Sequence, residues 1–198
     1  KKLKTSLFNP IHSRNYRKEE IKIFTKMRIK TIQKHLKIKD KNKIIHIEHE
    51  KGHQYYGLFA APKNFRKKCL VLTNEGMGDK SNLTVSVVRN GKMKELYYSK
   101  KCKTGVVYKL ITLLLGMKPS QHEFKVMGLA PYASEHEVQK AYNAAFKNLF
   151  GTKNFDIYLK DKPKDLFFHF QNRLQHCRFD GIAGAVQKSL EEVLVSWI

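Results

Sequence analysis

An Asn-Gly pair, Asn90 and Gly91, constrains the fold of this chain more than any other feature, because alternating apolar and polar runs flank it in LTVSVVRNGKMKELYYS. Asn-Gly readily takes the positive φ angles of a two-residue turn, so the two runs are predicted to pair as an antiparallel hairpin. A third run, KKCLVLTNEG, precedes them with the composition of a buried strand. The sequence therefore predicts three consecutive strands within residues 68–98.

Helical periodicity accounts for most of the remaining chain. Apolar residues recur every three or four positions in KEEIKIFTKMRIKTIQKHLKI, which predicts an amphipathic helix with a basic outer face. KIIHIEH is predicted as a short strand, and HEKGHQYYGLFAA as a helix closed by Pro62. Ser134 and Glu137 have the spacing of a capping box at the start of another helix. Further helices are expected over TGVVYKLITLLLG, KDLFFHFQNRLQHC and FDGIAGAVQKSLEEVLVSWI, and a short strand over NFDIYL.

Length and composition place the chain among globular proteins. Its 198 residues suffice for one domain with a substantial core. No apolar run is long enough to span a membrane, and the N-terminal residues have no secretory h-region. Three scattered cysteines without CxxC spacing indicate a reducing compartment, so we expect a cytoplasmic protein. The absence of an initiator Met, and an apolar helix face that continues to the last residue, lead us to expect an interior piece of a longer protein.

The formal net charge of +22 suits a nucleic acid or an anionic surface as partner. Most of the excess is Lys, spread along the chain among many Ile and Asn residues, as an AT-rich genome would encode an ordinary protein. Composition alone leaves both interpretations open. Arg is scarce, and no platform of aromatic and arginine residues accompanies the lysines. We therefore expect the charge to be background and expect no nucleic acid partner.

Three histidines fall within eight residues: His46, His49 and His53. On an α-helix, positions i and i+4 lie one above the other, so His49 and His53 can hold one metal ion. In a chain with nine histidines, an H-x-x-x-H pair is a weak signal, and a solvated or hydrogen-bonded pair also explains it. Two ligands leave a zinc-type site incomplete.

A second polar cluster, Glu75-Gly76-Met77-Gly78-Asp79, follows the strand in KKCLVLTNEG. Glycines let the backbone approach a ligand closely and expose N–H donors to a phosphate. A carboxylate at a strand end can hold a metal or accept a hydrogen bond. A plain β-turn between two strands accounts for the same residues. The segment matches neither the Walker A nor the G-x-G-x-x-G nucleotide-binding pattern.

Composition assigns no role to a third segment, HEFKVMGLAPYA. Together and in this order, the three segments resemble the N-terminal domain of the nodulation-type carbamoyltransferases. The resemblance rests on H-x-x-x-H before a strand, [DE]-G-x-G-D after it, and then T-G-x-x-Y, L-G-x-K-P and H-E-x-K-V-M-G-L-A-P-Y. It is best over residues 44–132 and weaker over residues 179–198.

The resemblance implies an α/β fold of the actin-like ATPase (ribonuclease H-like) superfold, here a partial domain with a mixed β-sheet and flanking helices. It implies ATP-dependent transfer of a carbamoyl group from carbamoyl phosphate, through carbamoyl-adenylate, to an acceptor hydroxyl. His49 and His53 match the family's ligands for a divalent metal, with iron favoured. Glu75 matches an acidic position that is usually Asp and is assigned a catalytic role, and Lys125 is a second catalytic candidate. The candidates for nucleotide binding are Gly76, Gly78 and Asp79.

Two other functions remain open. One is a tRNA-modifying threonylcarbamoyl transferase of the same superfold, against which KVMGLAPYA argues. The other is a basic nucleic-acid-binding module without catalysis, against which an intact metal site would argue. We expect the family's opening strand, its adenine-binding segment and a third metal ligand, an Asp, to lie outside this chain, so that the 198 residues alone do not complete the transfer. The sequence assigns neither the acceptor nor an oligomeric state.

Overall fold

The structure is a computed structural model that describes residues 18–45, 47–78 and 80–198. The chain forms two compact units, Lys1–Ile47 and Glu48–Ile198. The site and the sheet that carries it both lie in the second unit.

The first unit contains helix α1 (Lys18–Leu36) and a 3-10 turn, η1 (Lys41–Lys43). Lys37, which follows α1, has a φ of 54° and so leaves the helical conformation. This agrees with the predicted amphipathic helix and its end. The apolar stripe is largely exposed, at Ile23, Phe24, Met27, Ile32 and Leu36. The predicted strand in KIIHIEH is wrong for the residues that the structure describes: Ile45 and Ile47 are exposed and have no neighbouring strand to bond their backbone groups.

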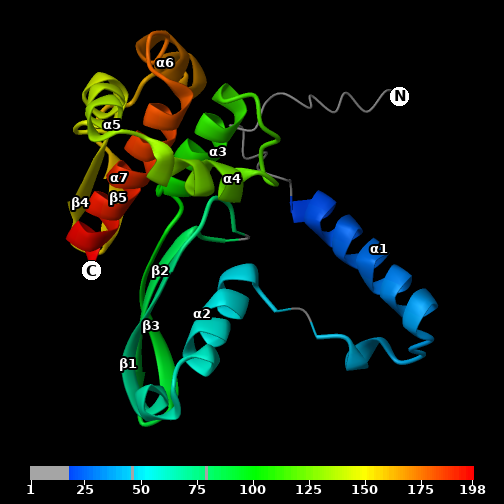
Figure 1. Ribbon diagram of the computed structural model, residues 1–198. Helices are drawn as coiled ribbons and strands as arrows, with labels where there is room; N and C mark the ends of the chain where they lie inside the picture. Colours follow the sequence, from blue (N-terminus) through cyan, green and yellow to red (C-terminus); the bar gives the residue numbers. More distant parts are fainter. Residues whose placement is uncertain (1–17, 46, 79) are drawn as a thin grey trace, which may run out of the picture. The chain divides into compact units, whose positions relative to one another are not determined.

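A three-stranded antiparallel sheet underlies the second unit (Figure 1). Its strands pair in the order β1 (Lys68–Asn74), β2 (Leu83–Arg89) and β3 (Lys92–Ser99). Asn90 and Gly91 have φ angles of 51° and 74°, which confirms the predicted turn. The prediction of a mixed sheet is wrong for the described strands, because neighbours in sequence that are joined by short connections pair antiparallel.

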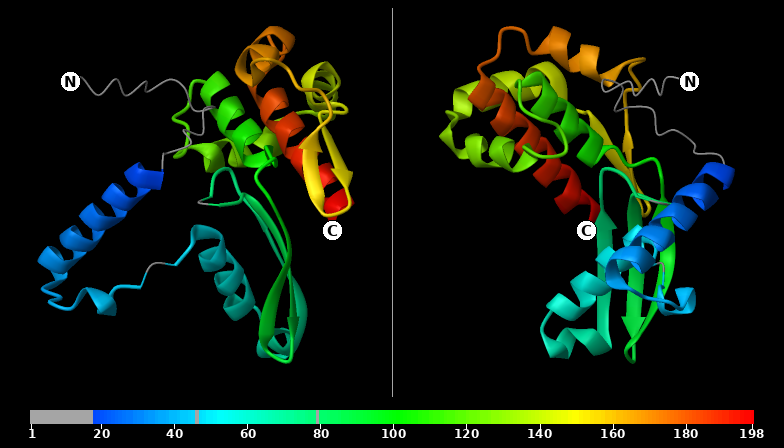
Figure 2. Two further views of the ribbon diagram at one scale, coloured as in Figure 1. Left: turned by 180° about the vertical axis from the view of Figure 1, so that it is seen from behind. Right: turned by 90° about the vertical axis from the view of Figure 1, so that its right-hand side faces the viewer.

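Helix α2 (His49–Ala60) lies along one face of this sheet, as both views in Figure 2 show. Leu58 of α2 packs against Val71 and Val88 in a buried apolar cluster. The chain then turns at Pro62 into a 3-10 segment, η2 (Lys63–Lys67), that leads into β1. The sheet and α2 therefore form a two-layer framework at whose end the site lies.

The remaining helices form a bundle around α7 (Phe179–Trp197), which packs against α3, α5 and the short strand β4. Gly184 faces Val138 of α5, where a Cβ would lie 2.5 Å from the valine Cγ2. Small residues on α7 thus permit the close approach of α5. Ser134 accepts from the Glu137 N–H, which confirms its predicted capping role. The bounds of the other elements are α3 (Thr104–Leu114), α4 (Glu123–Leu129), η3 (Ala130–Tyr132), α5 (Glu135–Ala141), η4 (Tyr142–Phe146), β4 (Phe150–Lys153), β5 (Asp156–Leu159) and α6 (Leu166–Arg173).

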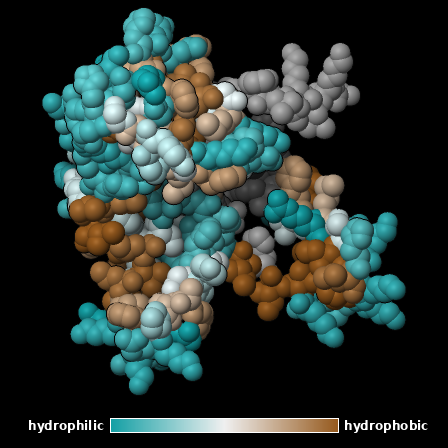
Figure 3. All heavy atoms as spheres, viewed as in Figure 1, coloured by the Kyte–Doolittle hydropathy of each residue, from teal (hydrophilic) through white to brown (hydrophobic). Residues whose placement is uncertain are grey.

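One apolar cluster joins the sheet to this bundle: Leu83, Cys102, Ile157 and Val193 are buried together. Figure 3 shows mainly polar atoms over the upper helices and a band of apolar atoms along the sheet and the end of α7. All three cysteines are free thiols. Among the described residues, no helix combines the length and apolar character needed to cross a membrane.

A buried carboxylate anchors the first turn of α7. Asp180 accepts from the Arg178 guanidinium at 3.1 Å (Nε–Oδ1) and 2.9 Å (Nη2–Oδ2), and from the Gly181 N–H at 2.9 Å. The hydrogen bonds from Arg178 are the main cause of a lowered pKa for Asp180, opposed by burial and assisted by the Gly181 N–H. The charged form of Asp180 therefore stabilises the folded state.

We predict that Asp180→Asn lowers the free energy of unfolding at neutral pH. A lowered folded-state pKa contributes stability that is fully present above the unfolded value of about 3.9 and is lost as the pH falls through the folded value. The gap between the two proteins, measured by urea unfolding, should therefore be constant from neutral pH to about pH 5 and narrow below that. Asp161→Asn, at an exposed position, serves as control. A gap that persists unchanged in acid would show that the carboxylate charge is not responsible.

Candidate metal centre

The paired histidines stand at the beginning of α2. His49 is the first residue of the helix and His53 lies one turn further on, so both project from the same face. The opposite face carries Gln54 and Leu58, which are buried against the sheet. The two imidazoles therefore turn away from the core, and their side chains are 44% and 50% exposed.

Glu75 lies beside the two histidines and directly follows the last residue of β1. Its N–H donates to the Asn82 carbonyl at 2.8 Å, which closes the turn after the strand. Its carboxylate oxygen Oε2 lies 2.7 Å from His49 Nε2 and 2.8 Å from His53 Nε2. The two Nε2 atoms are 3.1 Å apart, which confirms the convergence expected from the i, i+4 spacing. Three potential ligand atoms thus meet at one point.

Hydrogen bonds alone do not account well for the close approach of the two imidazole nitrogens and the Glu75 oxygen. If both imidazoles donated an Nε2–H to the carboxylate oxygen, the two protons would crowd each other across 3.1 Å. If only one donated, the lone pair of the other nitrogen would face a negatively charged oxygen at hydrogen-bond distance. A cation placed between the three atoms satisfies all of them, since neutral imidazole and carboxylate are both metal ligands.

The spacing of these atoms fits a transition-metal ion. Ligand atoms about 2.1 Å from one ion and at right angles to one another lie about 3.0 Å apart. The observed separations of 2.7–3.1 Å are close to that value. Two histidines and one carboxylate on one side of an ion, with the remaining positions open, are the ligand set of non-haem iron sites. The Glu75 side chain is 30% exposed, so the cluster is open to solvent.

A second contact holds the turn after β1 against helix α3. The Thr104 hydroxyl at the start of α3 donates to the Asn74 side-chain oxygen at 2.6 Å. Gly76 and Gly105 are in backbone contact, and a Cβ on Gly105 would lie 2.6 Å from the Cα and N of Gly76. The strand end that carries Glu75 is therefore fixed on the helix as well as on the sheet.

The sequence suggested a phosphate beside Gly78. In the structure, Glu50 and Ser81 lie next to this glycine. A Cβ at this position would collide with the Glu50 carboxylate and the Ser81 carbonyl, so glycine is required for packing the turn under α2. Nucleotide binding by Gly76 and Gly78 stays a prediction. Asp79 lies outside the described residues, as does His46.

Lys125 is not among the residues that converge on Glu75. It stands on α4, where its Nζ lies 3.4 Å from His122 Nε2 and 6.0 Å from the centre of the Phe124 ring. A catalytic role for Lys125 stays a prediction. Sequence reasoning missed Gln54, which holds α2 on the sheet, although a polar residue on the face that buries Leu58 was an available signal.

Fold and site together define an α/β domain with a candidate centre of two histidines and one carboxylate. The family model described as the carbamoyltransferase N-terminus matches residues 4–197. The chain belongs to this carbamoyltransferase N-terminal domain family, and the family supports carbamoyl transfer as the general activity. The match extends well beyond the segment in which the motifs were recognised. No curated protein matches the chain.

We predict that Gly105→Ala destabilises the protein by about 1–3 kcal/mol, because its Cβ must displace the backbone that carries Glu75. Gly57→Ala is the matched control, since a Cβ there meets nothing within 4 Å and the residue lies inside α2. That substitution should stabilise the protein by about 0.5–1 kcal/mol. Chemical denaturation of both variants measures the difference. Equal effects would contradict the close approach of Gly76 and Gly105.

Proposed function

We propose that this domain binds a divalent metal, with iron favoured, through His49, His53 and Glu75, and takes part in ATP-dependent carbamoyl transfer. Carbamoyl phosphate, ATP and one water give carbamoyl-adenylate with release of phosphate and pyrophosphate, and AMP leaves when the carbamoyl group passes to an acceptor hydroxyl. The observation that carries the proposal is the meeting of three ligand atoms within 3.1 Å of one another. We also propose that the domain is part of an actin-like ATPase superfold.

Each residue of the centre has a separate task in this proposal. His49 and His53 supply neutral Nε2 lone pairs, which requires both imidazoles to carry their proton on Nδ1. Glu75 supplies negative charge, so the three residues together balance half of the charge of a divalent ion. A bound metal of this kind acts as a Lewis acid on a phosphoryl or carbonyl oxygen. The partial exposure of all three side chains leaves that ion accessible to such an oxygen.

Glu75 departs from the Asp that its family position usually has. The additional methylene lengthens the side chain, and in this structure the carboxylate reaches both imidazoles. This supports a role for Glu75 as a metal ligand in addition to the catalytic role that its position implies. The tetrahedral and open site types both accept such a carboxylate.

Backbone groups of the turn supply the second part of the proposed mechanism. Gly76 carries no side chain on the backbone that follows Glu75, so an anionic oxygen near the metal can approach its N–H. Such donors are effective because they are fixed in position before the reaction begins. Here the contact with Gly105 and the hydrogen bond from Thr104 to Asn74 fix them.

We predict that the chain binds about one Fe²⁺ or Zn²⁺ and that His49→Ala/His53→Ala abolishes binding. Glu75→Gln should weaken binding by more than about tenfold, since loss of an outer-sphere partner alone typically costs 10–100-fold. Glu75→Asp should retain binding more than Glu75→Gln does. His136→Ala, a histidine on α5, is the control. Competition with a chelator indicator gives the affinities, and unchanged metal affinity in the double variant would refute the metal centre.

We predict that the same substitutions abolish pyrophosphate release from ATP in the presence of carbamoyl phosphate. The measurement uses the purified full-length protein. Loss of metal in the double histidine variant removes the Lewis acid. The assay is repeated without carbamoyl phosphate to separate adenylation from simple ATP hydrolysis. Normal turnover by a metal-free variant would contradict the proposed mechanism.

A further inference from the structure

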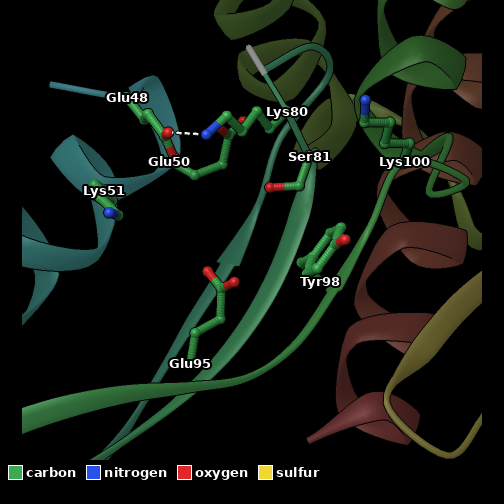
Figure 4. Close-up of a pocket in the computed structure, with 8 residues that line it drawn as sticks. All are labelled: Glu48, Glu50, Lys51, Lys80, Ser81, Glu95, Tyr98 and Lys100. Atoms are coloured by element: carbon green, nitrogen blue, oxygen red, sulfur yellow. Dashed lines mark hydrogen bonds and ion pairs between the residues drawn. The ribbon is translucent and has the colours of Figure 1, made fainter. Parts of the chain in front are cut away.

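A hollow of about 410 Å³ opens between the start of α2 and the sheet, as Figure 4 shows. Three carboxylates, three lysines, a serine and a tyrosine line it. Two of the carboxylates, Glu48 and Glu50, flank His49 in the sequence, so the hollow and the candidate metal centre share the first turn of α2. The hollow has the size of a site for a small molecule.

A β-bulge places two of the lining residues side by side. Glu95 pairs with Ser86 and Tyr98 pairs with Thr84, with a register shift between Val85 and Ser86. In a regular strand, residues three apart point to opposite faces of the sheet. The extra residue in β3 brings Glu95 and Tyr98 to the same face, the one that α2 covers. Bulges of this kind commonly re-aim side chains beside active sites.

A neutral amide holds the Glu95 carboxylate in this hollow. Gln54, which is 3% exposed, donates from Nε2 to Glu95 Oε2 at 3.1 Å. None of the ion pairs between described residues includes Glu95, although the chain has 39 Lys and Arg residues. The carboxylate is therefore available to a cationic group that enters from solvent.

The three lysines that line the hollow differ in their ion pairing. Lys80 forms an ion pair with Glu48. Lys51 and Lys100 are exposed, and they belong to none of the ion pairs found in the described part of the chain. The hollow thus offers both a carboxylate and ammonium groups to one ligand.

This mixture of charges selects the class of ligand. A purely cationic ligand would be repelled by Lys51 and Lys100, and a purely anionic one by Glu95. A molecule with an ammonium group and an anionic group can pair with both, and the exposed ring of Tyr98 adds a surface that attracts an ammonium ion. Lys51 and Lys100 lie on opposite sides of the hollow (Figure 4). We propose that the hollow binds a small zwitterion, with its ammonium group at Glu95 and Tyr98 and its anionic group at one of these two lysines.

Given the proposed function, this zwitterion is the acceptor of the carbamoyl group, because its site adjoins the candidate metal centre. The ligand would then carry a hydroxyl group as well. Neither Glu95 nor Tyr98 belongs to the candidate metal centre. Binding of the zwitterion to the hollow therefore requires neither metal nor ATP. The two proposals can therefore fail separately.

Four probes with one ring skeleton test the charge pattern: glucosamine phosphate, glucosamine, glucose phosphate and glucose. Binding to the full chain is followed by NMR chemical-shift perturbation in the absence of metal, ATP and carbamoyl phosphate. We expect glucosamine phosphate to bind tightest, by about three- to tenfold over each singly charged probe. Glucose should bind weakest.

Two variants test which side chains bind the ammonium group of the ligand and which bind its anionic group. Glu95→Gln preserves an acceptor for Gln54 and should weaken glucosamine and glucosamine phosphate while leaving glucose phosphate unchanged or tighter. Lys51→Gln/Lys100→Gln should have the opposite selectivity. Glu135→Gln and Lys153→Gln, on α5 and β4, are the matched controls. Circular dichroism and thermal unfolding verify that each variant is folded.

Equal affinity for the four probes would overturn the inference, because it would indicate recognition of hydroxyl groups alone. Absence of binding by glucosamine phosphate at millimolar concentration would also overturn it. A selective response in the variants together with an absent metal centre would keep the inference for the ligand and reject the proposed function.

Discussion

The hydrogen bonds of one buried amide hold the site together. Gln54 donates from Nε2 to the Thr84 hydroxyl at 2.9 Å and to Glu95 at 3.1 Å, which links α2 to the two strands β2 and β3. The Thr84 hydroxyl in turn lies 2.6 Å from the Thr73 hydroxyl of β1. A continuous series of hydrogen bonds thus crosses all three strands of the sheet. Gln54 and Thr84 are buried, and buried polar groups are stable only when they are hydrogen-bonded, so these contacts favour one position of the helix.

The position of α2 decides where the histidines point. With Gln54 and Leu58 against the sheet, His49 and His53 must lie on the opposite side of the helix, beyond the end of β1. Glu75 reaches them because it is the first residue after the strand and because its turn is held by Asn82 and by α3. The centre therefore depends on three elements that are far apart in the sequence. A displacement of any one of these elements would move a ligand atom away from the other two.

Both sides of the first turn of α2 carry polar side chains with different chemistry. His49 and His53 face Glu75, whereas Glu48 and Lys51 border the hollow beside Glu95. The proposed ion and the proposed zwitterion would thus be held by one rigid helix end, which favours a fixed distance between them. Reactions that join two bound groups gain most from such positioning, about 7–11 kcal/mol where the geometry is suitable. Helix α2 therefore connects the family's general activity with the specific chemistry proposed here.

The sequence by itself determined the local elements and the family. Asn90 and Gly91 fixed the hairpin because their backbone preferences are local, and the i, i+4 spacing put His49 and His53 on one helix face for the same reason. Only the tertiary structure decided that Glu75 meets both imidazoles, and that a bulge brings Glu95 and Tyr98 together. It also decided that β1 pairs antiparallel with β2 and that KIIHIEH forms no strand in its described part. These features arise from strand pairing and packing between segments that are distant in the sequence. The spacing of residues along the chain does not show which distant segments will make these contacts.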